Sequence, residues 1–274
     1  MSITSVGTGV SVLANQPDYS LAQSVQSQLG ASLDSTAPSV TILSTDARAD
    51  NLAAVATFVK AYGMPLQMGQ DASHAMEALE STMQSVIQQR PDLANATFDF
   101  QSDNGHIKVM SSTMSAKDMA WLEGQLNSNK ALSAAVQSFH DHAVEGYQLW
   151  ASLDGSAATS DPAAISAAAD KKFSFMDVFH RFSQAFVRGM DRSGTFSTLE
   201  GKPIDFDLSP TTAQSLLSFA NAAKAVKQGS VLYVDPAGGS HYGVLKGDIF
   251  GSLYALPDFR PPNDHNTLGL SAKA

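Results

Sequence analysis

The sequence predicts an α+β protein that is rich in helices and contains short antiparallel strands. Apolar residues recur at helical spacing in several segments, and an alternating segment around Asn104 and Gly105 is typical of a β-hairpin. Further short alternating segments follow residue 200. Because strands and helices alternate in this second half, a small α/β layered domain is the alternative fold there.

The segment 173–190 is the best candidate for a helix that organises the core. Its apolar residues follow helical spacing: Phe175, Val178, Phe179, Phe182, Phe186 and Met190. Asp177 and Arg181 fall on the opposite face. We therefore expect an amphipathic helix that inserts a row of phenylalanines into the core.

Residues 1–36 have the composition of a flexible leader. They are rich in Ser, Thr, Gly and Asn, and the first basic residue of the chain is Arg48. A secretory signal peptide needs a basic start and an apolar core, which this segment lacks. The segment resembles the leaders of proteins exported by bacterial type III secretion and flagellar systems. The resemblance is compositional and implies export without a Sec-type signal; a plain flexible tail and a cytoplasmic location are the alternatives.

Residues 37–150 are predicted to form a helical domain with a β-hairpin. It begins with a short strand at 39–43, followed by a helix that Asp50 caps and that Gly63 and Pro65 close. The apolar residues of this helix are Leu52, Val55, Ala56, Val59 and Tyr62. A second helix over 71–90 is expected to pack antiparallel to the first.

The rest of this domain carries the clearest local signals. Two alternating segments around Asn104 and Gly105 predict the hairpin. Ser115, with Asp118 three residues later, matches a capping box and predicts the start of the next helix. A further helix is expected over 130–150.

Residues 151–172 have the composition of a linker, because small and polar residues replace large apolar ones. A long surface loop within one domain is the alternative. The predicted second domain covers 173–274. After the Phe-rich helix, we expect a strand over 203–208 and a helix that begins at Ser209 and Pro210.

The end of the chain is predicted to be strand-rich and then irregular. Residues 231–235 form a strand candidate, one or two more strands follow from His241, and the segment from Pro257 is irregular.

Composition argues against several functions. The net charge is −9 and charged residues make up 16% of the chain, with no basic cluster that would bind nucleic acid or anionic lipid. No apolar run reaches the ~18 residues of a membrane span. The chain has no cysteine, which excludes disulfides, thiolate metal sites and cysteine nucleophiles. The absence of cysteine does not indicate the cellular compartment.

The densest group of possible metal ligands is His140, Asp141, His142 and Glu145. On one helix they offer at most two converging ligands, and a zinc site needs three. We interpret them as a polar helix face. No metal and no cofactor are therefore predicted.

A Gly-rich turn followed by His241 and an apolar strand resembles the histidine strand of papain-like peptidases. The resemblance covers about 20 residues and lacks the cysteine that such a histidine activates. A hydrolase that uses His241 with Asp235 or Asp248 is nonetheless a hypothesis to test against a structure.

The favoured function is that of an exported bacterial protein, such as a type III secretion-type effector or accessory protein, that binds another protein of unknown identity. The hydrolase is the second hypothesis, and a structural component of a phage or surface assembly is the third. Flagellin, hook and needle subunits fit poorly, since they end in a long heptad-patterned helix. The sequence does not specify an oligomeric state.

Overall fold

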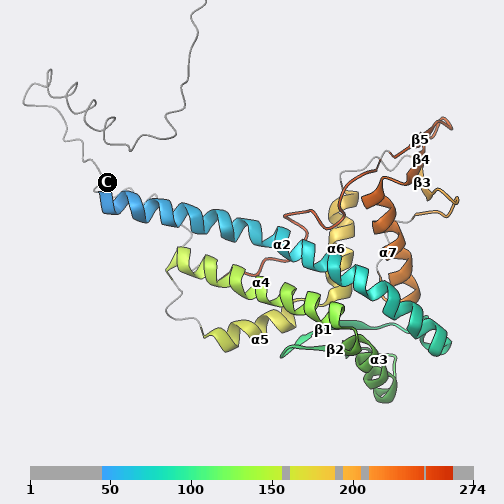
Figure 1. Ribbon diagram of the computed structural model, residues 1–274, viewed down its shortest axis with the longest axis horizontal. Coiled ribbons are helices and arrows are strands. Elements are labelled where there is room, and N and C mark those ends of the chain that lie inside the picture. The colour runs from blue at the N-terminus through green and yellow to red at the C-terminus, as the bar shows by residue number, and fades with distance from the viewer. Residues whose placement is uncertain (1–44, 156–160, 189–193, 205–209, 244, 262–274) are drawn as a thin grey trace, which may run out of the picture. The chain divides into compact units, whose positions relative to one another are not determined.

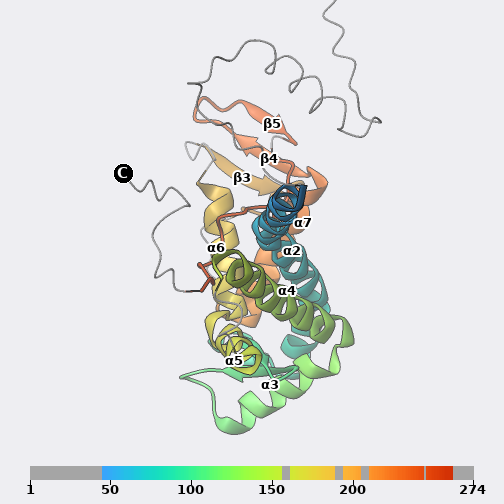
Figure 2. The ribbon, with the colours of Figure 1, turned by 90° about the vertical axis from the view of Figure 1, so that its left-hand side faces the viewer.

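A computed structural model describes residues 45–155, 161–188, 194–204, 210–243 and 245–261. The chain divides into two compact units, residues 1–49 and 50–274. Figures 1 and 2 show the helices and strands of the second unit. The predicted leader and the predicted strand at 39–43 lie outside the described residues.

The long helix α2, Thr45–Gln89, is continuous, so the prediction of two helices with a break between them is wrong. Pro65 lies inside the helix, and Asp50 is also helical instead of capping its start. A proline in a helix interior costs about 3 kcal/mol, since it removes one backbone hydrogen bond and crowds the preceding turn. Some other contribution must therefore stabilise the helix around Pro65.

Burial on both sides of Pro65 supplies that contribution. Met64 and Met68 are 7% and 5% exposed, and each buried side chain of this size contributes roughly 1.5–3 kcal/mol. Gly146 on the facing helix lets the two backbones approach here, because a Cβ at that position would lie 3.3 Å from the Cβ of Met64. Tertiary packing thus outweighs the helix-breaking effect of Pro65.

The β-hairpin and the helix after it are confirmed. Strands β1, Asp99–Asp103, and β2, His106–Met110, pair antiparallel around Asn104 and Gly105, which adopt positive φ values of 53° and 81°. Helix α3, Ala116–Ser128, begins after Ser115, whose hydroxyl accepts the backbone N–H of Asp118.

Helix α4, Lys130–Asp154, runs antiparallel to α2 and beside it (Figures 1 and 2). The predicted helix over 130–150 is confirmed and extended to Asp154. Helix α5, Pro162–Lys172, follows, so most of the segment with linker composition is helical. Its small residues suit a helix that packs closely, with Ile165 and Ala169 buried. The division of the chain into two halves stays a prediction.

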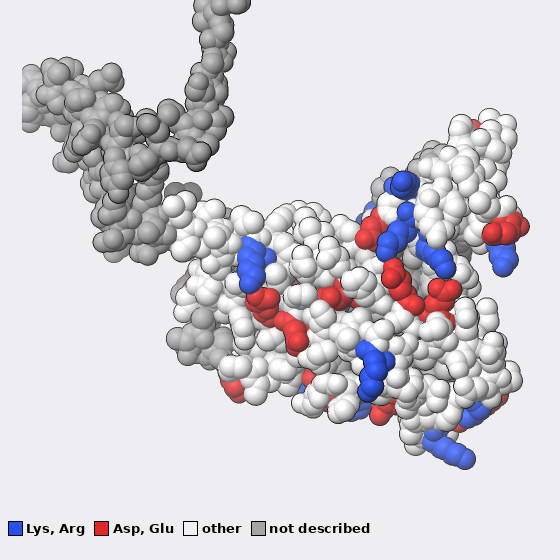
Figure 3. Space-filling model, viewed as in Figure 1, with Lys and Arg blue, Asp and Glu red and all other residues white. Residues whose placement is uncertain are grey.

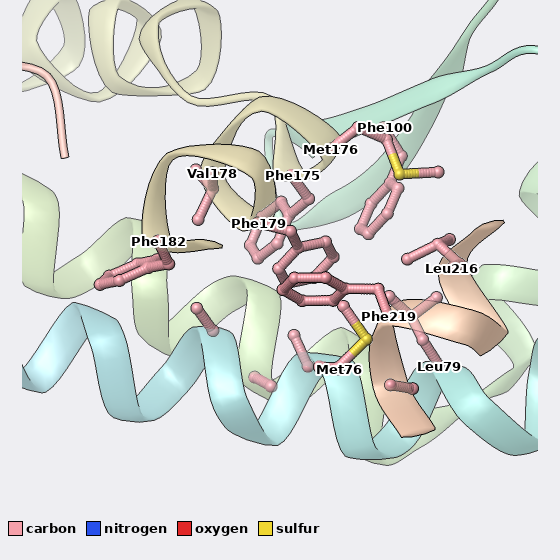
Figure 4. Close-up of a cluster of buried hydrophobic side chains, with 14 of the residues drawn as sticks. Met76, Leu79, Phe100, Phe175, Met176, Val178, Phe179, Phe182, Leu216 and Phe219 are labelled. Atoms are coloured by element: carbon pink, nitrogen blue, oxygen red, sulfur yellow. The ribbon is translucent and has the colours of Figure 1, made fainter. Parts of the chain in front are cut away.

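Helix α6, Phe175–Val187, buries Phe175, Phe179 and Phe182 in the core as predicted. Phe186 is half-buried, and Met190 lies outside the described residues. Figure 4 shows Phe175, Phe179 and Phe182 above Met76 and Leu79 of α2, with Phe219 beside them. Phe175 stacks on Phe100 of β1 at a ring-centroid distance of 5.0 Å. One hydrophobic cluster extends from Met68 to Ala255 and includes residues from both predicted halves.

The C-terminal elements differ from prediction in detail. Helix α7, Ala213–Gln228, is capped by Thr212 through a reciprocal capping box with Ser215. It therefore begins later than predicted: Pro210 precedes the helix, and Ser209 lies outside the described residues. Its predicted end at Gly229 is confirmed, with φ 66°. Within the expected strand over 203–208, Pro203 forms a single bridge to Ser197, while residues 205–208 lie outside the described residues.

A three-stranded antiparallel sheet completes the unit. It has the order β3-β4-β5 and is formed by β3, Thr195–Thr198, β4, Val231–Val234, and β5, Ser240–Tyr242. The strand over 231–235 is thus confirmed, and a single three-residue strand follows it in the described residues. The α+β prediction is confirmed: helices dominate, and the strands are short and antiparallel. Within the described residues, no helix is both long and apolar enough to cross a membrane.

Candidate protein-binding surface

The first half of α2 carries a stripe of large apolar side chains in contact with solvent. These side chains, which we call the outer stripe, are exposed as follows: Leu52 64%, Val55 58%, Val59 64%, Tyr62 41% and Leu66 37%. At about 100° per residue, the outer stripe lies on roughly the opposite side of α2 from Met64 and Met68, which face α4. The helix is therefore apolar on two faces, and none of the described residues covers one of them.

The outer stripe has the spacing of a coiled-coil seam. Its residues follow steps of three, four, three and four positions, which is an a/d heptad pattern over two heptads. Between residues 51 and 70 the single charged residue is Lys60, and it pairs with Glu145 of α4. Figure 3 shows few charged side chains along this part of α2. The surface is thus neutral and suited to another apolar helix.

An aromatic cluster borders the outer stripe on one side. The ring of Phe58 stacks on that of Tyr62 at 6.0 Å and meets the Trp150 ring edge-on at 5.7 Å. The guanidinium of Arg260 lies 4.2 Å from the centroid of the Trp150 ring, which is a cation–π contact. The aromatic cluster therefore joins α2, α4 and the segment after α7.

The hydroxyl groups of Tyr62 and Tyr254 lie 2.7 Å apart. This hydrogen bond raises the pKa of Tyr62 above its ordinary value of 10.0, and the charge that Tyr254 would carry and partial burial raise it further. Tyr254 itself is 77% exposed, so its ring is accessible at the surface.

Two shallow cavities flank the outer stripe. One, of about 290 Å³, is lined by Pro65, Trp150, Tyr254 and Leu256, among others. The other, of about 400 Å³, lies between Val59, Gly63 and Glu145. A helix placed on the outer stripe would meet concave, partly apolar surface on both sides.

Polar contacts hold the second half of α2 against α4, beyond the outer stripe. The Nδ1 atom of His142 lies 2.6 Å from a carboxylate oxygen of Asp71, which is 7% exposed. The amide of Asn129 donates to the Ala78 carbonyl and to the Thr82 hydroxyl. These contacts fix the second half of α2 against α4.

The histidine and carboxylate group on α4 divides between two neighbours. His142 turns to α2, whereas the Nε2 atom of His140 faces Ser166 and Asp170 of α5. Within the described residues, no group of three or more histidines and carboxylates is arranged to hold a metal. The group anchors three helices to one another, which the sequence alone did not indicate.

The predicted hydrolase residues are only partly brought together. The Nε2 atom of His241 lies 3.0 Å from the Asp235 carboxylate on the β4–β5 hairpin, and this contact lowers the pKa of Asp235. The His241 side chain is 54% exposed and does not line any of the cavities described here. Asp248 instead lines a cavity of about 500 Å³ between α2 and α7. The hydrolase stays a prediction.

No protein-family model, curated protein or solved structure matches this chain. Function is therefore inferred from geometry. The sequence did indicate helical spacing in Leu52, Val55, Val59 and Tyr62, but not that this face is uncovered. Trp150, Tyr254 and Arg260 were missed as site residues, because nothing local in the sequence shows that they meet.

Proposed function

We propose that this chain is an exported bacterial protein that acts by binding another protein, and that the outer stripe of α2 is its binding surface. The observation that carries the proposal is the exposure of five large apolar side chains in heptad spacing. Side chains of this kind are normally buried, and a contiguous exposed group of them marks an interaction site.

The chemistry of the surface favours an amphipathic α-helix as the bound element. A helix with its own apolar a and d positions would insert side chains between Leu52, Val55 and Val59, as helices do in grooves and coiled coils. The aromatic cluster and Arg260 would form the partly polar rim that such interfaces have. Tyrosine, tryptophan and arginine are also the residues that most often dominate binding energy.

Export is supported by the cation-free, Ser-rich composition of the leader, residues 1–36. Deletion of residues 1–35 is expected to abolish export from a host with a type III apparatus and to leave the protein in the cytoplasm. Export that continues undiminished, or that does not require the apparatus, would contradict this half of the proposal.

Binding can be tested without knowing the natural partner. The probe is a synthetic three-heptad peptide with Leu and Ile at its a and d positions, titrated calorimetrically into the dilute full-length protein. We expect saturable binding with a negative heat-capacity change, which marks apolar burial. Val55→Asp should weaken binding at least ~10-fold, since a charge would be buried without a partner.

Ser81→Asp is the matched control, because Ser81 is an exposed residue of α2 outside the outer stripe. This variant should bind the peptide as the parent does. Equal affinity of the parent, Val55→Asp and Ser81→Asp would place the binding elsewhere and overturn the proposal. Absence of binding to the parent would also overturn it.

A further inference from the structure

We infer that the partner that fits the outer stripe is a second copy of this chain, and that the two copies pair antiparallel through α2. This inference rests on the proposed function, because it names the partner of the same surface. It makes the protein a two-fold symmetric dimer.

The area of the surface matches this occupant. The outer stripe and Phe58, each between about a third and two thirds exposed, present roughly 500–600 Å² of apolar surface. Two copies facing each other would bury at most roughly 1,000–1,200 Å², which is at or below the lower limit of about 1,200 Å² for stable specific interfaces. A dimer in exchange with monomer is the expected result.

The charge of the surface also permits self-association. A surface that meets its own copy must not place like charges opposite each other. Lys60, the single charged residue between positions 51 and 70, lies outside the heptad seam and is already paired with Glu145. The outer stripe therefore selects neither an acidic nor a basic partner, and it does not repel itself.

Side-chain size determines the orientation. A parallel pair would place Tyr62 directly against Tyr62 of the second copy at one d layer. An antiparallel pair sets a residues against d residues, so that Tyr62 meets Leu52 of the second copy and Val55 meets its Val59. Facing large and medium side chains in this way avoids two phenols in one layer. Parallel dimers are favoured by β-branched residues at a and Leu at d, and the outer stripe does not have this pattern.

The test is a disulfide cross-linking experiment on the full chain, which has no cysteine of its own. In the antiparallel pair, Leu52 lies opposite Tyr62 of the second copy, whereas the two Leu52 residues are about 15 Å apart along the axis at 1.5 Å per residue. A disulfide needs Cα atoms within about 7 Å. Mixed Leu52→Cys and Tyr62→Cys chains should cross-link under mild oxidation, and neither variant should cross-link alone.

Ser81→Cys is the control for random collision and should not cross-link with any variant. The parent should give a light-scattering mass that rises with concentration from one chain of 28.9 kDa towards two. Val55→Asp should remain monomeric over the same range. Any one of three results would overturn the inference. Leu52→Cys could cross-link alone, the parent could have a mass well above two chains, or the parent could stay monomeric.

These outcomes separate the inference from the proposed function. A parent that is monomeric but binds the heptad peptide keeps the binding surface and removes the dimer. A parent that dimerises through the outer stripe, yet does not bind the peptide as a dilute monomer, keeps the dimer and removes the proposed binding of other proteins.

Discussion

Gly69 of α2 is packed directly against the backbone of Phe250. A Cβ atom at Gly69 would lie 2.1 Å from the Phe250 carbonyl oxygen, far inside van der Waals contact. The C-terminal segment therefore crosses α2 at a point where only glycine fits. The same segment carries Tyr254, whose hydroxyl lies 2.7 Å from that of Tyr62.

Gly69→Ala should destabilise the fold by about 2–3 kcal/mol or more, because the backbone of Phe250 must move away. Gly63→Ala in the same helix is the control, since a Cβ there meets nothing within 4 Å. It should stabilise the helix by about 0.5–1 kcal/mol. Urea unfolding measures both free energies. Equal effects of the two substitutions would contradict the close crossing.

Asn129 caps α4 and ties it to α2. Its side-chain oxygen accepts the N–H groups of Ala131 and Leu132, and its amide donates to α2. Asn129→Ala should cost about 2–3 kcal/mol, as it loses both the cap and the interhelical bonds.

Asn129→Asp separates the two roles of this side chain. An aspartate keeps the cap but cannot donate, so its loss of unfolding free energy should fall between those of the parent and Asn129→Ala. Thermal and urea unfolding of the three proteins give the order. An aspartate variant as unstable as the alanine variant would assign the whole effect to the contact with α2.

Asp99 links β1 to α6 and makes stability depend on pH. Burial raises its pKa above the ordinary value of 3.8, despite hydrogen bonds from the N–H groups of Met176 and Phe100. Because the folded state binds the proton more tightly, this group contributes stability below pH 3.8 that is lost as pH rises through the folded pKa.

Asp99→Asn keeps a hydrogen-bond acceptor and carries no charge. The variant should therefore not lose this stability as pH rises. The difference in unfolding free energy, variant minus parent, should grow as pH rises from about 3 and then level off. Urea unfolding across this pH range measures the difference. A difference that is constant with pH, or that shrinks, would show that burial does not dominate at Asp99.

The Tyr62–Tyr254 hydrogen bond can be observed by titration. Tyr254→Phe removes the main cause of the raised Tyr62 pKa, so the pKa of Tyr62 should fall towards 10.0. Tyrosine ionisation is followed by ultraviolet absorbance. Subtracting the titration of the Tyr62→Phe/Tyr254→Phe double variant from that of Tyr254→Phe gives the ionisation of Tyr62 alone. A Tyr62 pKa that does not change would mean that the two hydroxyls do not meet in solution.

The sequence predicted correctly those structural features that depend on a few neighbouring residues. Ser115 and Asp118, the turn at Asn104 and Gly105, and the phenylalanine spacing of α6 all act within one or two turns of chain. Pro65 was misread because packing on α4 outweighs its local cost. Helix α7 begins at Ala213, since the reciprocal bonds of Thr212 and Ser215 satisfy its first turn.

The candidate site was only partly predictable for the same physical reason. The heptad spacing from Leu52 to Leu66 is visible in the sequence, but exposure depends on which face of α2 meets α4. Trp150 lies on α4, whereas Tyr254 and Arg260 both lie in the segment after α7, so two distant parts of the chain supply them. Tyr254 and Arg260 belong to the segment that crosses α2 at Gly69, and no local sequence pattern predicts this crossing.

The most direct test of the outer stripe is the melting temperature of Val59→Asp and of the parent, each measured dilute with and without the heptad peptide. A surface reserved for binding predicts nearly equal melting temperatures without peptide, and a rise on adding peptide for the parent alone. A Val59→Asp variant that melts well below the parent without peptide would show that the stripe holds the fold together. An equal rise for both proteins would show that the peptide binds elsewhere.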